Sequence, residues 1–136
     1  MEQRDFLLRE IERMGQVLNA FRQKLFGGKD QLAISIEKEV DDAKGMLLKE
    51  VNLDLDKLLL LNKEETSNYL DSFKGFNATN IERFAEYMAQ IGFETKSEKS
   101  AVYFEKALHL YELTSLKSQT FSFEREKKIK AVRAVL

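Results

Sequence analysis

The sequence predicts an all-α protein built from antiparallel helical hairpins, with about six or seven helices in one bundle. The chain of 136 residues has no proline and only six glycines, so it lacks the turn residues that β-sandwiches and β-barrels need. Leucine, lysine and glutamate, which are strong helix formers, are abundant. Apolar residues recur three and four positions apart along most of the chain. One domain covering 1–136 is the simplest organisation.

An N-terminal helical hairpin is predicted over residues 1–51. Its first helix runs from Arg4 to about Phe26, and glycine at Gly27–Gly28 ends it because glycine adopts the left-handed conformation without steric cost. The second helix runs from about Gln31 to Val51, and Gly45 within it predicts a close crossing with a neighbouring helix. The apolar seam of the first helix can pair with the second helix or with another subunit. That seam consists of Leu7, Ile11, Met14, Leu18, Phe21 and Leu25.

Five further helices are predicted in residues 52–136, and the first is a short buried one in "LDLDKLLLL". The helix that contains Tyr103 to Leu113 is apolar on more than one side, which predicts a position in the middle of the stack. A final basic helix is expected from about Phe121 to Leu136. Three of the helix starts are predicted by capping boxes, at Asn62 with Glu65, Thr79 with Glu82, and Thr95 with Glu98.

The stretch from Ile81 to Ser115 resembles one helical hairpin of the tetratricopeptide family. It has Met88 where the family usually has glycine, and no second copy lies about 34 residues away. The resemblance implies a tetratricopeptide-like (TPR-like), α-solenoid-like arrangement for 52–136 and a role in binding other proteins, whereas a generic helical hairpin explains the pattern equally well. The matched positions are Phe84, Tyr87, Met88 and Ile91 in the first helix, Phe104 and Ala107 in the second, and Ser100 and Ala101 at the crossing.

The opening "RDFLLREIERMGQVLNAF" is similar to the start of an uncharacterised family of small bacterial helical proteins, over Asp5 to Leu18. That resemblance implies no chemistry. The N-terminus has no signal-peptide core, and the longest aliphatic run is far shorter than the roughly 20 residues of a membrane span. The absence of cysteine excludes disulfides and thiolate metal sites. We therefore expect a cytoplasmic protein with no membrane span.

No catalytic or metal-binding motif is recognisable. His109 is the only histidine, and with Glu105 it forms a single pair that is too small for a metal site, so a histidine at the core boundary is expected. Acidic residues cluster at 37–42, but neighbours on a helix point in different directions, which predicts solvated acidic surface. Glu37 and Asp41 share a face without a matched base nearby. We expect no cofactor, no metal ion and no enzyme activity.

The leading functional hypothesis is a non-catalytic scaffold or adaptor that binds a protein partner. An alternative is a helical bundle that binds a small apolar or anionic ligand between its helices, lined by Phe, Tyr and Met. Nucleic acid is not expected, because the net charge is −1. The basic segment 124–136 should cap its own bundle, with the acidic region 37–71 as its counterpart, although it could also dock on an acidic partner, on anionic lipid or on RNA. Helical spacing suggests one binding face formed by Arg83, Tyr87, Gln90, Tyr103 and Lys106.

Overall fold

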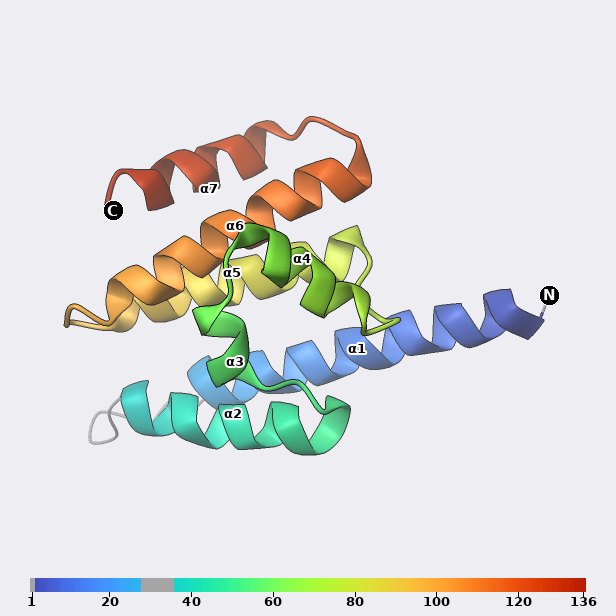
Figure 1. Cartoon of the computed structure of the whole chain (residues 1–136). Helices are drawn as coiled ribbons and strands as arrows, with labels where there is room; N and C mark the ends of the chain where they lie inside the picture. The colour runs from blue at the N-terminus through green and yellow to red at the C-terminus, as the bar shows by residue number, and fades with distance from the viewer. Residues whose placement is uncertain (1, 28–35) are drawn as a thin grey trace.

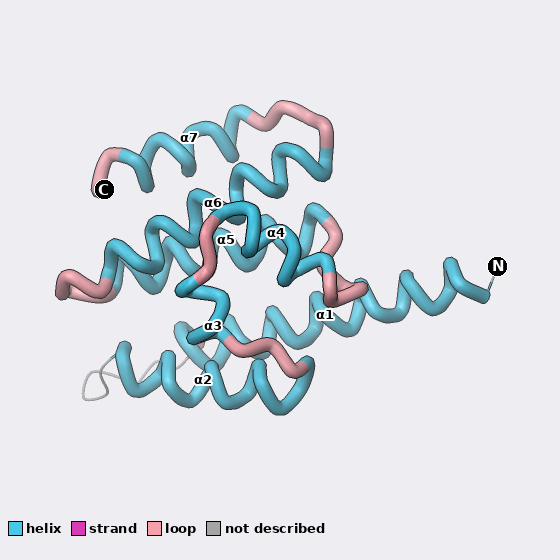
Figure 2. The backbone as a smooth tube through the Cα atoms, in the orientation of Figure 1, coloured by secondary structure: helices cyan, strands magenta, loops and turns pink. Residues whose placement is uncertain are grey.

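The computed structural model describes residues 2–27 and 36–136 (Figures 1 and 2). These residues form seven α-helices and no β-strand, which confirms the all-α prediction. The start of the second predicted helix, before Ile36, and the second glycine of the predicted turn lie outside the described residues. The helices are α1 (Glu2–Phe26), α2 (Ile36–Val51), α3 (Leu55–Leu60), α4 (Lys63–Asp71), α5 (Ala78–Glu94), α6 (Ser100–Ser118) and α7 (Phe123–Arg133).

The five longer helices stack in the spatial order α2, α1, α5, α6, α7 (Figure 1). Neighbours in the stack run antiparallel, except for α1 and α5, which run parallel (Figure 1). The short helices α3 and α4 lie on one side of this stack (Figure 1). Helix α3 packs against α2 and α6, and α4 packs against α6. Helix α6 therefore contacts four others, namely α3, α4, α5 and α7. This position explains why α6 is apolar on more than one side, as the sequence predicted. No described helix has the length and apolarity that crossing a membrane requires.

The core is continuous and rich in aromatic side chains. Phe84 on α5 packs edge-on against Phe21 of α1, with ring centres 5.9 Å apart, and stacks on Phe76 at 5.8 Å. The predicted seam of α1 is buried from Met14 onwards. Leu7, at the N-terminal end of the predicted seam, is 44% exposed, because the first turns of α1 extend past the rest of the bundle (Figure 1). The apolar residues of α1 therefore keep their coiled-coil spacing in its first turns, where no described helix packs against them.

The capping-box prediction is confirmed at the start of α4. Asn62 accepts a hydrogen bond from the backbone N–H of Glu65, and the Glu65 carboxylate accepts one from the backbone N–H of Asn62. The prediction at Thr79 is wrong, because Asn77 caps α5 two residues earlier by accepting a hydrogen bond from the backbone N–H of Asn80. An Asn side chain at Ncap satisfies an otherwise free helix N–H at least as well as Thr does, so the earlier residue takes the cap.

The third predicted capping box, at Thr95, is also wrong. Thr95 ends α5 instead of starting α6, and its hydroxyl donates to the carbonyl oxygen of Ile91 at 2.7 Å. Helix α6 begins at Ser100 with no side-chain cap. Gly27 does follow the last residue of α1, but it does not take the left-handed conformation that the sequence suggested, since no described glycine has a positive φ.

Gly92, and not the residues predicted from the family pattern, marks the closest approach of α5 and α6. A Cβ at Gly92 would lie 2.7 Å from an atom of the Phe104 ring, so only glycine fits there without a shift. Ala101, expected at the crossing, is exposed. The close crossing predicted at Gly45 is also wrong, because a Cβ there would meet no atom within 4 Å.

The basic helix α7 packs on its own bundle, as expected, with Ile129 and Val132 buried. Its acidic counterparts are on α5 and α6, however, and not in the 37–71 region. Arg125 donates to Glu82 at 2.9 Å, and Lys128 donates to Glu86 at 2.5 Å. The prediction failed because charge counts along the chain do not show which helix lies beside α7.

Candidate functional site

The five residues suggested by helical spacing do not form one surface. Tyr87 is buried against the Phe21 ring, and Lys106 is buried beneath the connection between α3 and α4. Arg83 and Gln90 are exposed on α5, and Arg83 lines a hollow beside α1. Tyr103 is half-buried on α6 and lines a different hollow beside α2. The candidate site has to be sought elsewhere on the molecule.

Lys106 is an interior lysine that ties α6 to the α3–α4 connection. It is 1% exposed, and its ammonium donates to the carbonyl oxygen of Leu61 at 2.8 Å and to the hydroxyl of Thr66 at 2.5 Å. His109 Nδ1 lies 3.3 Å from the same ammonium. Burial lowers the pKa of Lys106 to about 8, and burial followed by the Lys106 charge lowers the pKa of His109. The contacts give Lys106 a structural role.

Stability should rise with pH between about 8 and 9.5, because the folded state binds fewer protons at Lys106 than the unfolded state, whose lysine pKa is 10.5. We expect a gain of about 1–2 kcal/mol in unfolding free energy, measured by urea denaturation at several pH values. Lys106→Met should flatten this rise, and Lys127→Met, at an exposed position of α7, should leave it intact. Equal slopes in all three proteins would contradict the assignment.

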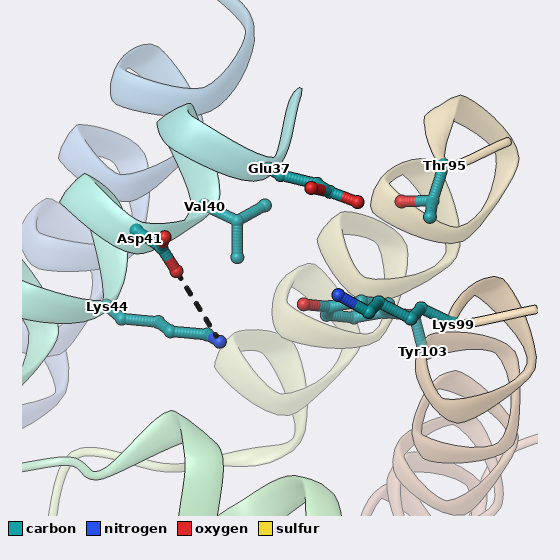
Figure 3. Close-up of a pocket in the computed structure, with 7 residues that line it drawn as sticks. All are labelled: Glu37, Val40, Asp41, Lys44, Thr95, Lys99 and Tyr103. Atoms are coloured by element: carbon teal, nitrogen blue, oxygen red, sulfur yellow. Dashed lines mark ion pairs between the residues drawn. The ribbon is translucent and has the colours of Figure 1, made fainter. Parts of the chain in front are cut away.

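A small polar cleft lies between α2 and the start of α6 (Figure 3). Its volume is about 140 Å³, and Lys44 and Lys99 reach into it together with the Tyr103 hydroxyl. Lys44 lies 4.0 Å from Asp41 and 2.7 Å from Asp56, so the structure does supply the base that the acidic cluster appeared to lack. The cleft is lined by Glu37, Val40, Asp41, Lys44, Thr95, Lys99 and Tyr103.

Lys44 is the cleft residue whose charge is paired, with Asp41 inside the cleft and Asp56 beside it. Burial lowers the pKa of Lys44, but the hydrogen bond to Asp56 and the nearby negative groups outweigh it, so the pKa is raised. Burial also raises the pKa of the Tyr103 hydroxyl, which keeps it neutral. Small-molecule sites usually enclose about 300–1,000 Å³, well above the volume of this cleft. The cleft is therefore better suited to water or a very small polar molecule than to a metabolite.

The hollow beside Arg83 contains a hydrogen-bonded connection between α1 and the start of α5. The side-chain amide of the buried Asn80 donates to the carbonyl oxygens of Ile11, at 2.9 Å, and Gly75, at 2.8 Å. Its oxygen accepts from Arg83 at 3.2 Å. Because the polar atoms of the Asn80 side chain all bond within the fold, Asn80 holds α1 and α5 together and is not free to bind a ligand.

A groove with three apolar residues among polar and charged ones runs between α4, α6 and α7. Two hollows of about 350 and 300 Å³ meet at Lys63 and Leu116. Leu116 is 67% exposed where the hollows meet, with Leu113 and Ile129 in the surrounding walls. We call this the α4–α6–α7 groove. Its residues are Lys63, Glu64, Ser67, Glu112, Leu113, Ser115, Leu116, Glu126, Ile129 and Arg133.

The charges of the α4–α6–α7 groove are unevenly paired. Glu112 of α6 pairs with Lys63 of α4 and with Arg133 of α7, at 3.5 Å in the second case, so one carboxylate connects the three helices. Glu64 and Glu126 make no ion pair with another described residue. The charge that the groove offers to a ligand is therefore negative, with one free carboxylate on α4 and one on α7.

Two exposed phenylalanines lie at the α6–α7 turn, a few residues beyond Leu116. The rings of Phe121 and Phe123 pack edge-on with centres 4.8 Å apart, and both are largely exposed. An aromatic pair held in one geometry by its own contact loses little conformational freedom when it is covered by a partner. The two rings form an exposed aromatic pair at the α6–α7 turn.

Nothing in the sequence distinguished Leu116 from a buried leucine, because both occupy apolar positions of a helix. The described residues contain no group of three His, Cys, Asp or Glu side chains placed to hold a metal ion. Comparisons with protein-family models, with curated proteins and with solved structures found no match to this chain.

Proposed function

We propose that this chain is a non-catalytic protein-interaction module that binds an amphipathic helix of a partner in the α4–α6–α7 groove. The observation that carries the proposal is Leu116, which stands exposed where two open hollows meet. An apolar groove between helices is a common docking site for an apolar helix face, which inserts side chains one turn apart. The resemblance of Ile81 to Ser115 to a tetratricopeptide hairpin is compatible with this role and includes part of the groove.

The charges favour a partner helix with basic residues beside its apolar face. Glu64 and Glu126 border the groove on opposite sides and are free to pair with lysine or arginine. Lys63 and Arg133 share the single carboxylate of Glu112, and with Glu64 and Glu126 the groove has a net charge of −1. Complementary charges at the rim mainly set specificity and association rate, while the apolar anchors supply most of the affinity.

The ligand-binding alternative has less support from the geometry. The aromatic residues that such a cavity would need are packed against one another in the core, as Phe21, Phe76 and Phe84 are. The cleft in Figure 3 is polar and small. Both observations favour a surface interaction over an enclosed small-molecule site.

A displayed library of amphipathic helical peptides, selected on the wild-type protein, would test this proposal. We expect enriched peptides with leucine or phenylalanine one turn apart and with basic flanks. Leu116→Glu should weaken the binding of such a peptide by about tenfold or more, measured by fluorescence anisotropy, because it places a carboxylate among the apolar anchors.

Leu48→Glu is the matched control, since Leu48 is an exposed leucine on α2 that does not line the groove. It should leave the affinity unchanged. Glu126→Lys should weaken binding most for the peptides with the most basic flanks. The proposal would be wrong if no peptide were enriched, or if the enriched peptides bound the Leu116→Glu and Leu48→Glu variants equally well.

A further inference from the structure

The connection between α3 and α4 carries few buried apolar side chains. Residues 59–69, which we call the strap, lie on one side of the helix stack (Figure 1). Leu58 before the strap and Leu70 after it are fully buried, so both of its ends are fixed in the core. Within the strap, Leu60 is 87% exposed, and the other apolar side chains are only partly buried, namely Leu59, Leu61 and Tyr69. Segments with few buried apolar contacts open at a lower free energy than the rest of a fold.

The one fully buried side chain of the strap is polar. Thr66 is 1% exposed, and its hydroxyl accepts a hydrogen bond from the Lys106 ammonium of α6 at 2.5 Å. The same ammonium donates to the carbonyl oxygen of Leu61 at 2.8 Å. The interior contact between the strap and α6 is therefore made through a charged group.

Lys106 makes no ion pair with a described carboxylate. Its hydrogen-bond acceptors, the Thr66 hydroxyl and the Leu61 carbonyl, are neutral, and His109 Nδ1 lies 3.3 Å away. An ammonium that leaves water without a counter-charge has a large desolvation cost, which neutral acceptors offset only in part. Closing the strap over a charged Lys106 is therefore costly. The titratable groups around Lys106 and His109 are Glu65 and Lys63 of the strap and Glu105 and Glu112 of α6.

A second polar contact between the strap and α6 is an exposed ion pair. Lys63 pairs with Glu112, and the Lys63 side chain is 54% exposed. An ion pair in water shifts an equilibrium by less than about fivefold, whereas a hydrogen bond to a buried charged group shifts it by about tenfold or more. Lys106 therefore has the larger effect on whether the strap is open or closed.

We propose that the strap opens locally from α6 while the rest of the bundle stays folded, and that the buried charge of Lys106 drives this opening. In the closed form the strap supplies the α4 side of the α4–α6–α7 groove, through Lys63, Glu64 and Ser67. Opening removes this side and uncovers Leu113, which is 7% exposed and lines the same hollow. The strap therefore regulates the groove, and this consequence rests on the function proposed above. The opening itself does not.

The opening should depend on pH, with a sign that is set by Lys106. In the closed form burial lowers the pKa of Lys106 to about 8, and in the open form, in water, the pKa returns toward 10.5. Below pH 8 the lysine is protonated in both forms, so the strap opens most readily there. As the pH rises from about 8 to 9.5, mainly the closed form loses its proton, which should lower the opening constant about tenfold.

Native-state hydrogen exchange at about pH 7, followed by NMR in low concentrations of urea, would show whether the strap opens by itself. The chain is used alone, without any peptide, so the result is independent of groove binding. We expect the amides from Thr66 to Tyr69 to exchange with little dependence on urea, because a local opening exposes little surface. The central amides of α5 and α6 should show the steep dependence of global unfolding. An equally steep dependence in the strap would overturn the proposal.

Tryptic cleavage after Lys63, identified by mass spectrometry, would measure the pH dependence, because a protease cuts this segment only when it is open. The rate at each pH is divided by the rate for a peptide of residues 59–69, which corrects for the pH dependence of the enzyme. We expect about a tenfold fall in the normalised rate between about pH 8 and 9.5. Lys106→Met should abolish the fall, and Lys127→Met, at an exposed position of α7, should keep it. A wild-type rate that does not change with pH would overturn the role of Lys106.

Two variants of Thr66 test the contact itself. Thr66→Val keeps the shape of the side chain but removes the hydroxyl, so the ammonium loses an acceptor and cleavage after Lys63 should rise about tenfold or more. Thr66→Ser keeps the hydroxyl and should raise cleavage much less. Adding Lys106→Met to Thr66→Val removes the charge and should return cleavage to the wild-type rate or below. The proposal fails if this double variant is cleaved as fast as Thr66→Val alone, because the charge of Lys106 then has no part in the opening.

Discussion

Phe84→Ala is expected to lower the free energy of unfolding by about 3–5 kcal/mol, the largest loss from any single truncation considered for this protein. Phe84 is fully buried, and its ring contacts the rings of Phe21 on α1 and Phe76 in the turn before α5. Its removal leaves a cavity where α1 and α5 meet, and the surrounding rings can fill that space only in part. Denaturation in urea should show a lower midpoint with an unchanged slope.

Phe121→Ala is the matched control for this prediction. It deletes the same atoms from a ring that is mostly exposed and touches only Phe123 among the aromatic residues. The change should alter the unfolding free energy by less than about 1 kcal/mol. Similar losses in the two variants would show that Phe84 does not connect α1 to α5 as the structure indicates.

Asn80→Asp is expected to cost about 2–4 kcal/mol, although it changes only an amide group into a carboxylate. The Asn80 amide donates to the carbonyl oxygens of Ile11 and Gly75, which joins α1 to the start of α5. A carboxylate has no hydrogen to donate, so it would place negative charge against two carbonyl oxygens in a buried site. Arg83 donates to the side-chain oxygen of Asn80, and in the aspartate variant its positive charge would offset part of this cost.

Asn68→Asp tests whether the added charge alone explains such a loss. Asn68 is exposed on α4, so the same chemical change there should cost less than about 0.5 kcal/mol. Thermal and urea unfolding of both variants at neutral pH would separate the two effects. Asn80→Asp within 0.5 kcal/mol of Asn68→Asp would contradict the role assigned to the buried amide.

Local patterns in the sequence predicted the helices well, because helix formation depends on residues within a turn or two of each other. The spacing from Met14 to Leu25 gave the buried side of α1, and the Asn62–Glu65 pair gave the start of α4. The same rules failed at Thr79 and Thr95, where more than one residue could cap or end a helix. Which of two neighbouring residues caps the helix depends on where the backbone turns into it, and the tertiary structure sets that point.

The candidate site was not predictable in the same way. Lys106 was placed on the surface by helical spacing, yet the connection between α3 and α4 covers it and accepts its hydrogen bonds. Leu7 belongs to the predicted apolar seam of α1 and Leu116 occupies an apolar helical position, yet both are exposed. No rule based on spacing separates these leucines from Leu18 or Leu110, because the difference lies in which helix is beside them.

The sequence by itself determined the all-helical class, most helix positions and the composition of the apolar faces, since these depend on interactions between residues close in the chain. Only the tertiary structure decided which faces have a partner. It packed α6 against α3, α4, α5 and α7, aligned α7 with acidic residues of α5, and left Leu7 in the first turns of α1 and Leu116 in the α4–α6–α7 groove exposed. Burial requires a second element at the right place, and segments distant in the sequence supply it.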